Sequence, residues 1–433
     1  MPQPTARSSG ARLRVAALAI LFATAAPAAA SAQKPDSASA ARDSLAARVE
    51  RAEEAIELLK QQLAAQSESG VTTRSGLKLE WSGRMLANAF GNSRRTNNAD
   101  VPLFVRPDTA SGLPQGGGGI AIRQSTVGLA VTGTRVLGAE FRGDLDVDFF
   151  GGQQGSAGGR TFPLLRLRTA RAILTWAHGE LLVGQEQPLT SGINPVSLAS
   201  VGTPGFAAAG NLWLWLPQAR ATLEAGTQLK IAMQGAVLAP MTGDPAGAFD
   251  TDFDVAERAK RPFLQGRMRL RWGEGDRQGE VGIGIHQGWF AARGDSLLES
   301  RGYMADALLP LGPRVDLRGE AWDGRGLRPL GGGQVGQLFG QQGVVVRGRG
   351  AWGQLNWRVA PRVAVGSGYG VDDPNDADLG AGARLKNVTT AAHLIVRPGG
   401  PLVINAEWRR TTTTYAARAY QNDHLNVGVG FEF

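Results

Sequence analysis

The sequence predicts an all-β chain that forms a transmembrane antiparallel β-barrel of about 16 strands, with a short N-terminal coiled-coil helix before it. Three observations lead to this prediction. Residues Leu425 to Phe433 alternate between apolar side chains and small or polar ones, and the chain stops on an aromatic residue. The N-terminal segment has the features of a secretory signal. Between these ends, alternating segments are separated by connections that are by turns long and short, which is the layout of a membrane barrel.

The composition narrows the class of protein. The chain has 433 residues and no cysteine, so disulfides, thiolate metal sites and cysteine nucleophiles are excluded. The formal charge is +8. Removal of residues 1–32, which contain three arginines, lowers it to +5 for the mature chain. The basic residues are dispersed, so we expect no nucleic-acid partner. No apolar run of about 20 residues follows the N-terminus, so no spanning helix is predicted after processing.

Residues 1–32 are predicted to be a signal peptide. Arg7, Arg12 and Arg14 supply its positive charge, residues 15–26 its apolar core, and Ala30-Ser31-Ala32 its cleavage site. A short N-terminal anchor helix is the alternative. We expect export to a bacterial outer membrane, with the segment that follows the signal lying in the periplasm.

Residues 33–70 are predicted to be a periplasmic coiled-coil segment. Apolar residues recur there at alternating spacings of four and three, as in the seam of a coiled coil: Leu45, Val49, Ala52, Ile56, Leu59 and Leu63. This seam mildly favours a dimer. The alternative is a single amphipathic helix packed on its own barrel.

Residues 71–433 are predicted to be the barrel. The expected strands are 77–90, 121–133, 136–150, 164–176, 179–187, 213–224, 227–238, 262–273, 279–291, 301–310, 314–323, 343–358, 362–371, 380–396, 401–413 and 421–433. An even count two lower or two higher stays open, because boundaries from sequence are uncertain by about 2–4 residues. Segment 343–358 changes its alternation near the middle, which predicts a bulge there.

Two short motifs resemble a known family. The segment from Arg123 to Leu129, with sequence RQSTVGL, is similar to an early strand motif of the DcaP-like trimeric outer-membrane porins. Gly184-Gln185 resembles the end of a strand in that family, and Glu186 stands where the family has an aromatic residue. The resemblance implies a homotrimer, a periplasmic coiled coil and uptake of small anions such as dicarboxylates. The expected partners are outer-membrane lipid and lipopolysaccharide, the barrel-assembly machinery and small anionic solutes.

Basic residues in the polar register of the strands are predicted to line the pore, because guanidinium groups match carboxylates and phosphates. They are Arg166, Arg168, Arg267, Arg269, Arg271, Arg314, Arg318, Arg347, Arg349, Arg384 and Lys386. The alternative is structural, since wall arginines can pair with carboxylates such as Asp144, Asp146, Asp316 or Glu320. For the three arginines of segment 262–273, pairing with Glu224 or Glu280 would cancel the positive field.

Loop 188–212 is the third long connection and is predicted to narrow the pore. It carries no acidic residue, so it would not repel anions, and its polar side chains include Asn194, Ser197, Ser200 and Thr203. A loop that lies outside against the rim is the alternative.

The function that follows is an outer-membrane porin for small, anionic solutes, without cofactor, metal or catalytic residues. A non-selective general porin is the alternative within this class. An outer-membrane enzyme is less favoured because the four histidines are scattered and no hydrolase or zinc motif occurs. A structural tether, with a plugged barrel and a coiled coil that grips periplasmic partners, also stays open.

Overall fold

The computed structural model describes residues 70–72, 77–151, 163–242, 252–293 and 296–433. The predicted signal peptide and nearly all of the predicted coiled coil lie outside these residues. Gly70, the last residue of the predicted coiled coil, begins strand β1 instead. None of the described helices is long and apolar enough to cross a bilayer.

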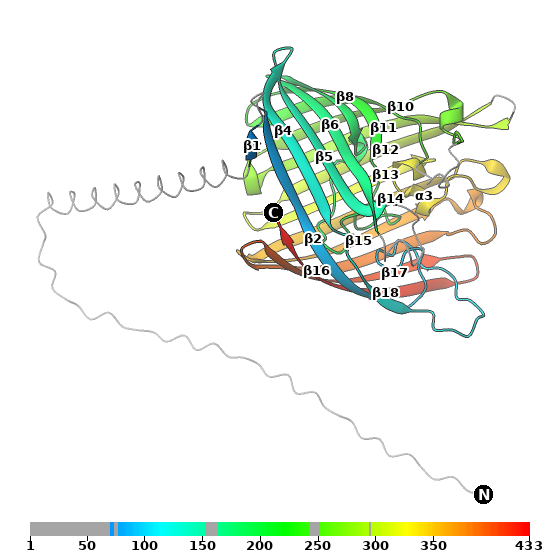
Figure 1. The fold of residues 1–433 in the computed structure, drawn as a ribbon. Helices are drawn as coiled ribbons and strands as arrows, with labels where there is room; N and C mark the ends of the chain where they lie inside the picture. Colours follow the sequence, from blue (N-terminus) through cyan, green and yellow to red (C-terminus); the bar gives the residue numbers. More distant parts are fainter. Residues whose placement is uncertain (1–69, 73–76, 152–162, 243–251, 294–295) are drawn as a thin grey trace, which may run out of the picture. The chain divides into compact units, whose positions relative to one another are not determined.

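The described residues form one closed antiparallel sheet (Figure 1), in which strands that follow one another in the chain pair side by side and β18 closes onto β2. The strands are β1 (Gly70–Thr72), β2 (Lys78–Asn92), β3 (Gly117–Ala121), β4 (Thr126–Val136), β5 (Ala139–Gly151), β6 (Leu164–Trp176), β7 (Gly179–Glu186), β8 (Leu216–Ala225), β9 (Leu229–Leu238), β10 (Phe263–Trp272), β11 (Gly279–Ala291), β12 (Leu297–Pro310), β13 (Val315–Arg325), β14 (Arg347–Ala360), β15 (Val363–Pro374), β16 (Lys386–Gly399), β17 (Leu402–Thr414) and β18 (Ala419–Glu432).

The described helices are all short and lie in the connections. They are η1 (Leu189–Ser191), η2 (Glu257–Ala259), η3 (Gly275–Arg277), η5 (Arg328–Leu330), α3 (Gly333–Gly336), η6 (Gln341–Gly343) and η7 (Asp376–Asp378).

The barrel has 16 strand positions, as the sequence predicts. Strands β3 and β4 share one position, because both pair with β2, at residues 88–92 and 78–84 respectively. The backbone leaves the ladder between them, where Ser125 Oγ accepts a 2.9 Å hydrogen bond from the Leu86 N–H. Strand β1 pairs with the start of β2, next to Phe433, whose backbone exchanges hydrogen bonds with Gly83.

Most predicted strand boundaries lie within three residues of the observed ones, and those of β6 and β11 agree residue for residue. The bulge expected near the middle of segment 343–358 is wrong. Strand β14 starts only at Arg347, and its register shift lies near the other end, between Arg358 and Ala360. Val344 and Val346 belong to the preceding loop, so their alternation with the strand carries no information.

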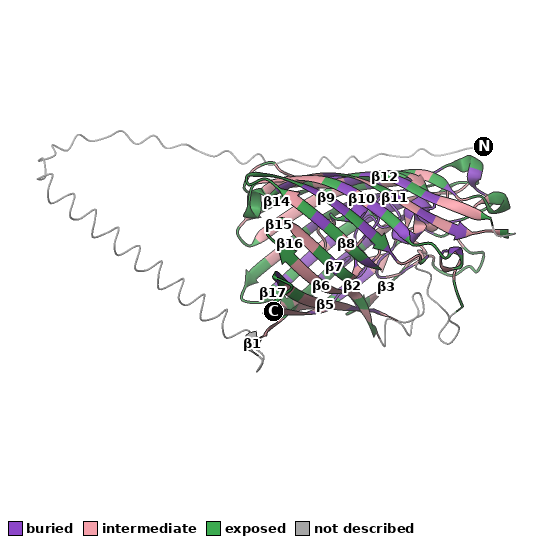
Figure 2. Cartoon of the chain, turned by 90° about the horizontal axis from the view of Figure 1, so that it is seen from above, coloured by how far each residue is buried: buried purple, intermediate pink, exposed green. Residues whose placement is uncertain are grey.

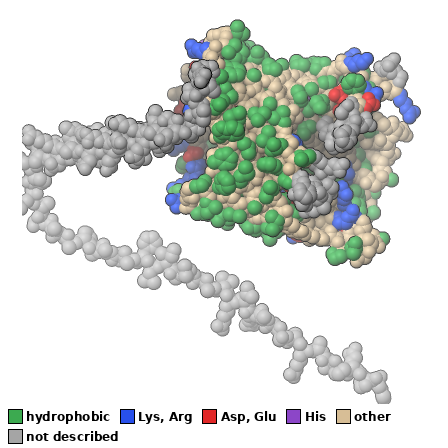
Figure 3. All heavy atoms as spheres, in the orientation of Figure 1, with side chains coloured by type: hydrophobic (Ala, Val, Ile, Leu, Met, Phe, Trp, Pro, Cys, Tyr) green, Lys and Arg blue, Asp and Glu red, His purple; other side chains and the backbone are tan. Residues whose placement is uncertain are grey.

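The two faces of the wall differ in polarity. Along β18, Leu425, Val427 and Val429 are about half exposed, whereas Asn422 and Asn426 are fully buried. Successive side chains of a strand point to opposite faces, so the apolar residues face outward and the polar ones inward. Figure 2 shows this alternation of exposed and buried residues along the strands, and Figure 3 shows hydrophobic side chains gathered over the outer face.

The connections are sorted by length between the two ends of the barrel. One end carries the long ones, including 93–116, 187–215, 239–262, 326–346 and 375–385; the other carries short turns such as 137–138, 177–178, 226–228, 361–362 and 400–401. An apolar cluster fills part of the lumen at the long-loop end of β8–β13. Its members include Leu212, Leu216, Leu238, Phe263, Phe290, Met304, Trp322, Leu327, Leu330 and Leu338.

Candidate functional site

The connection between β7 and β8, residues 187–215 and here called loop L3, folds into the barrel. Three glutamine side chains of the wall hold its backbone. Gln265 on β10 accepts from the Leu189 N–H at 2.8 Å, and Gln124, between β3 and β4, accepts from two further loop N–H groups at 2.7 and 3.0 Å. Gln354 on β14 both accepts from and donates to the backbone of Val196, at 2.7 and 2.9 Å. Because these strands lie far apart around the barrel, L3 must cross its interior.

Three of the four polar residues predicted on this loop make hydrogen bonds to the wall. Asn194 donates to the Gln187 side chain at 3.0 Å, and its carbonyl accepts from Arg318 at 3.3 Å. Ser197 donates to Glu407 at 2.5 Å, and Ser200 accepts from Arg409. Ser200 and Thr203 are buried, whereas Asn194 and Ser197 are half-buried. Asn194 and Ser197 are therefore the two that a solute in the lumen could reach.

The second half of L3 joins the apolar cluster. The backbone N–H groups of Trp213 and Leu214 both donate to the carbonyl of Leu330 in loop 326–346, at 2.8 and 3.1 Å. The indole of Trp322 on β13 donates to the Gly210 carbonyl at 2.9 Å. Two long loops thus pack together against β8–β13, and the remaining cavity lies between the first part of L3 and strands β6–β12.

This cavity has a volume of about 330 Å³ and lies beside the first residues of L3. Its charged lining consists of four arginines and two glutamates, a formal charge of +2: Arg171, Arg220, Arg267, Arg269, Glu186 and Glu280. Gly192 and Ile193 of L3 form one side of it, together with Gln187. Wall strands and L3 both contribute to this cavity, so it is a basic recess of the lumen between the loop and the wall.

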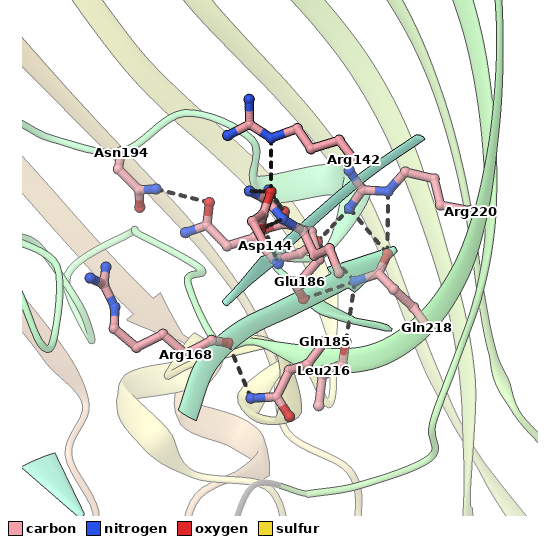
Figure 4. Close-up of polar contacts among 11 residues, drawn as sticks. Arg142, Asp144, Arg168, Gln185, Glu186, Asn194, Leu216, Gln218 and Arg220 are labelled. Carbon is pink, nitrogen blue, oxygen red and sulfur yellow. Dashed lines mark hydrogen bonds and ion pairs between the residues drawn. The ribbon is translucent and has the colours of Figure 1, made fainter. Parts of the chain in front are cut away.

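Arg171 on β6 links two carboxylates of the wall. Its guanidinium donates to both oxygens of Asp144 on β5, at 2.6 and 2.9 Å, and also contacts Glu186 at the end of β7. Figure 4 shows Asp144 and Glu186 close to one another among polar side chains of neighbouring strands. Asp144 is only 8% exposed at its side chain, whereas Arg171 is 28% exposed. The guanidinium, rather than the carboxylate, therefore faces the lumen.

Arg220 on β8 makes no ion pair with a described residue. Its guanidinium donates to Gln218 Oε1 at 3.0 and 3.3 Å and to the carbonyl of Gln187 at 2.5 Å (Figure 4). These acceptors are neutral, so its positive charge is not cancelled by a contacting carboxylate. Arg220 is for this reason the strongest candidate for attracting an anion.

The three arginines of β10 each contact a carboxylate. Arg267 contacts Asp306 and, at 2.5 Å, Glu280; Arg269 lies 3.5 Å from Glu280; and Arg271 contacts Glu224. This is the pairing that the sequence left open as an alternative. Arg267 is almost completely buried, and Arg269 is more exposed than Glu280, so of the two it is Arg269 that presents charge to the lumen.

Of the other basic residues predicted to line the pore, three lie inside the barrel and one lies in a short turn. Arg166 and Arg168 on β6 lie inside and pair with Asp148 and Asp146, at 2.6 and 2.8 Å. Arg318 on β13 also lies inside, 2.8 Å from Asp316. Arg314 is exposed in the short turn before β13 rather than in the strand.

Arg384 lies among the long loops, where it donates to the Val335 carbonyl at 3.0 Å and stacks over Phe104. Burial lowers the pKa of Arg384 below its ordinary value. A guanidinium pKa is so high that the group still keeps its charge. Arg384 is thus a charged group at the long-loop mouth and not in the strand wall.

Three predicted pore residues face the outside instead. Arg347 and Arg349 share their register on β14 with Leu355 and Trp357, which are exposed on the outer face. Lys386 begins β16 in the outward register and lies 3.8 Å from Asp373, and Arg349 lies 3.1 Å from the same carboxylate. The prediction that these three line the pore is wrong. For Arg347 and Arg349 the alternation was aligned on the loop residues before β14, and Lys386 shares its register on β16 with the outward Leu394.

Sequence reasoning missed Arg171 and Arg220. On β6 the register shifts beside Arg168, so that the strand inverts its alternation and Arg171 points inward with Arg166 and Arg168. No residue in that stretch of the sequence indicates the register shift. The inward position of Arg220 could have been predicted, because it lies on the same face of its strand as the polar residues Gln218, Thr222 and Glu224.

The described residues offer little for an enzyme. His286 lies 3.1 Å from Ser300 Oγ and 3.2 Å from Gln265, which resembles a serine–histidine pair. Both His286 and Ser300 are buried, and Ser300 also donates to the Gly326 carbonyl at 3.0 Å, so no substrate can reach the hydroxyl. Among the described residues, no three His, Asp or Glu side chains are grouped as metal ligands.

No family model and no curated protein matches the chain. Solved structures do. The outer-membrane channel DcaP of Acinetobacter baumannii superposes with a TM-score of 0.65 at 15% identity, covering 84% of this chain and all of that one. An anion-selective porin from Comamonas acidovorans gives 0.54 at 13% identity, covering 82% of this chain and 100% of that one.

A third structure, OprB of Pseudomonas putida, gives a TM-score of 0.51 at 10% identity, covering 82% of this chain and 94% of that one. The chain has the fold of a porin barrel. The likeness to DcaP that the sequence motifs predicted is confirmed at the level of the fold.

Proposed function

We propose that this protein is an outer-membrane porin through which small hydrophilic solutes diffuse. The observation that carries the proposal is the fixing of L3 across a closed barrel by Gln124, Gln265 and Gln354, which leaves a polar cavity between loop and wall. A barrel of this strand number encloses an aqueous lumen, and a loop inside it sets the narrowest point. The apolar outer face suits a lipid environment.

The proposed orientation places the long loops outside the cell and the short turns in the periplasm, as in other barrels of this type. Residues 1–32 would then direct export, and residues 33–70 would form a periplasmic coiled coil before the barrel. We include a homotrimer and insertion by the barrel-assembly machinery in the proposal. The likeness in fold to the outer-membrane channel DcaP supports the outer-membrane location.

We further propose that the solutes are small anions with carboxylate groups. Arg220 has no carboxylate in contact among the described residues, and of the pairs Arg171–Asp144 and Arg269–Glu280 beside the cavity the arginine is in each case the more exposed member. A guanidinium binds a carboxylate through parallel hydrogen bonds. An anion that enters the cavity would therefore meet donors first, with the wall carboxylates behind them.

The second candidate is a general porin with little selectivity. It is favoured by the extensive pairing of wall arginines with Asp and Glu, which removes most of the net charge of the lumen. Both candidates require an open channel, and they differ only in the sign and size of ion preference.

The test of the channel itself is conductance. Purified full-length protein in a planar bilayer should give stepwise openings, and purified protein should show no hydrolysis of ester or peptide substrates. A barrel without conductance would favour a plugged tether, and hydrolysis that is lost in a Ser300→Ala variant would favour an enzyme.

A further inference from the structure

The outer face of the barrel carries an unusual row of like charges. Register places Arg301 on β12 directly opposite Arg325 on β13, and Arg325 directly opposite Arg347 on β14. All three are exposed and lie at the long-loop end of their strands. Like charges directly opposite one another destabilise a sheet. We call these three residues the arginine row.

Two of the three arginines in the row have no carboxylate within hydrogen-bonding distance among the described residues. The third, Arg347, donates to both carboxylate oxygens of Asp378 in the neighbouring loop, at 2.7 and 2.9 Å, and holds the pKa of Asp378 below its ordinary value. Arg325 lies 3.6 Å from Glu299, too far for a direct hydrogen bond. Arg301 contacts the Tyr303 hydroxyl and has no carboxylate partner among the described residues.

A second row lies directly below the first on the same face. It pairs Tyr303, Asp323, Arg349 and Asp373 across β12–β15. The third row contains only small or apolar residues, namely Ala305, Ala321, Ala351 and Val371. Down the wall, the face thus changes from cationic through mixed to apolar within three rows.

Two grooves follow this order. One, of about 660 Å³, is lined by the arginine row, the second row and residues 374–376, and its four arginines and three aspartates give it a formal charge of +1. The other, of about 620 Å³, is lined by the second and third rows. Tyr303, Asp323, Arg349 and Asp373 line both, so the two grooves are continuous. An occupant would need an anionic group at the long-loop end and an apolar chain that extends along the wall.

We propose that this groove binds lipopolysaccharide of the outer leaflet, with a phosphate of lipid A on the arginine row and an acyl chain over the alanines of the third row. Guanidinium groups bind phosphate through paired hydrogen bonds, and phosphate relieves the repulsion between opposed arginines. The row spans two strand spacings of about 4.8 Å, a width that suits a phosphorylated headgroup. The proposal rests on the proposed orientation in the outer membrane.

The test is lipid binding by full-length protein in detergent, measured by native mass spectrometry with purified lipid A. Wild type should retain lipid A through detergent exchange. The variant R301Q/R325Q/R347Q should bind at least about tenfold more weakly, because it loses the charge-assisted hydrogen bonds to the phosphate. A matched variant, R135Q/R410Q/R418Q, removes three exposed arginines elsewhere and should bind like wild type.

Two further arms identify the ligand. Dephosphorylated lipid A should bind poorly to wild type, and Ala321→Phe, which fills the third row without touching a charge, should also weaken binding. Equal binding by both arginine variants would overturn the proposal. Displacement of lipid A by millimolar inorganic phosphate would show a free-anion site instead, and loss of the oligomer in R301Q/R325Q/R347Q would show that the groove is a subunit contact.

Conductance of the same preparations separates this proposal from the proposed function. R301Q/R325Q/R347Q should conduct like wild type, because the arginine row lies outside the lumen. A protein that binds lipid A through the row yet never conducts would leave the lipid site standing and refute the porin.

Discussion

Two sets of arginines in this barrel share one spacing and lie on opposite faces. On β10, Arg267, Arg269 and Arg271 alternate with Met268 and Leu270 and face the lumen. On β14, Arg347 and Arg349 alternate with glycines and face outward. The spacing of arginines at every second position therefore does not determine which face of the barrel they occupy.

The residues between the arginines decide it. The apolar Met268 and Leu270 occupy the outer face of β10, which places its arginines inside. On β14 the inner positions are Gly348 and Gly350, and a Cβ at Gly350 would lie 2.4 Å from the Trp322 ring. The inner face is thus already covered by a tryptophan from β13, and glycine makes room for it.

The two sets also differ in energetics. Arg267 and Asp306 are 3% and 1% exposed at their side chains, so their pairing is desolvated. Arg349 is 74% exposed and its pairing with Asp373 is screened by solvent. Losing one partner of a buried pair leaves an unpaired charge, whereas losing an exposed one has little effect.

This difference gives the largest expected effect. Arg267→Leu leaves the buried Asp306 unpaired in the wall and leaves Glu280 with Arg269 alone, so it should destabilise the barrel by about 3–5 kcal/mol. The temperature at which the folded band converts to the unfolded one on SDS gels should fall clearly. Arg349→Leu is the matched control and should leave that temperature unchanged. Equal shifts for the two variants would mean that burial does not distinguish them.

A smaller effect is expected from the inner glycine of β14. Gly350→Ala forces the Trp322 ring to move and should cost about 1–3 kcal/mol, the usual penalty of overpacking. Gly235→Ala on β9 is the control, because its Cβ would meet nothing within 4 Å. The same gel assay measures both. A neutral Gly350→Ala would show that the ring is not what keeps glycine at that position.

The loop contacts should change function more than stability. The variant Gln124→Ala/Gln354→Ala removes four hydrogen bonds to the L3 backbone, each contributing about 1 kcal/mol. Single-channel recordings should show a larger mean conductance and more frequent flicker. Gln287→Ala removes an outward amide and should conduct like wild type. Unchanged recordings for the double variant would mean that L3 does not set the pore size.

Much of the fold could be predicted from sequence because the membrane barrel imposes strict alternation. The bounds of β6 and β11 and the sorting of loops by length follow from that rule. The prediction of which face a residue takes failed where the alternation is broken. Beside Arg168 a register shift turns Arg171 inward, and before Arg347 the loop valines have the same spacing as strand residues. Leu355 and Trp357 did carry the correct register for β14.

The candidate site depended on contacts that spacing does not contain. That Arg267, Arg269 and Arg271 are paired follows from Glu224, Glu280 and Asp306 on three other strands. Arg220 keeps an uncompensated positive charge because its hydrogen-bond acceptors, Gln218 and the Gln187 carbonyl, are neutral. The Gln187 carbonyl reaches it only in the folded loop. Partners of this kind are brought together by tertiary structure.

The reversal potential in a tenfold gradient of potassium chloride tests the central claim most directly, which is that guanidinium groups facing the lumen favour anions. Wild type should prefer chloride. Arg171→Gln/Arg220→Gln removes the formal +2 charge of the cavity lining and should move the potential to zero or to cation preference. The outward pair Arg325→Gln/Arg349→Gln should leave it unchanged. A wild-type channel that prefers cations, or an inward double variant that behaves like wild type, would contradict the account.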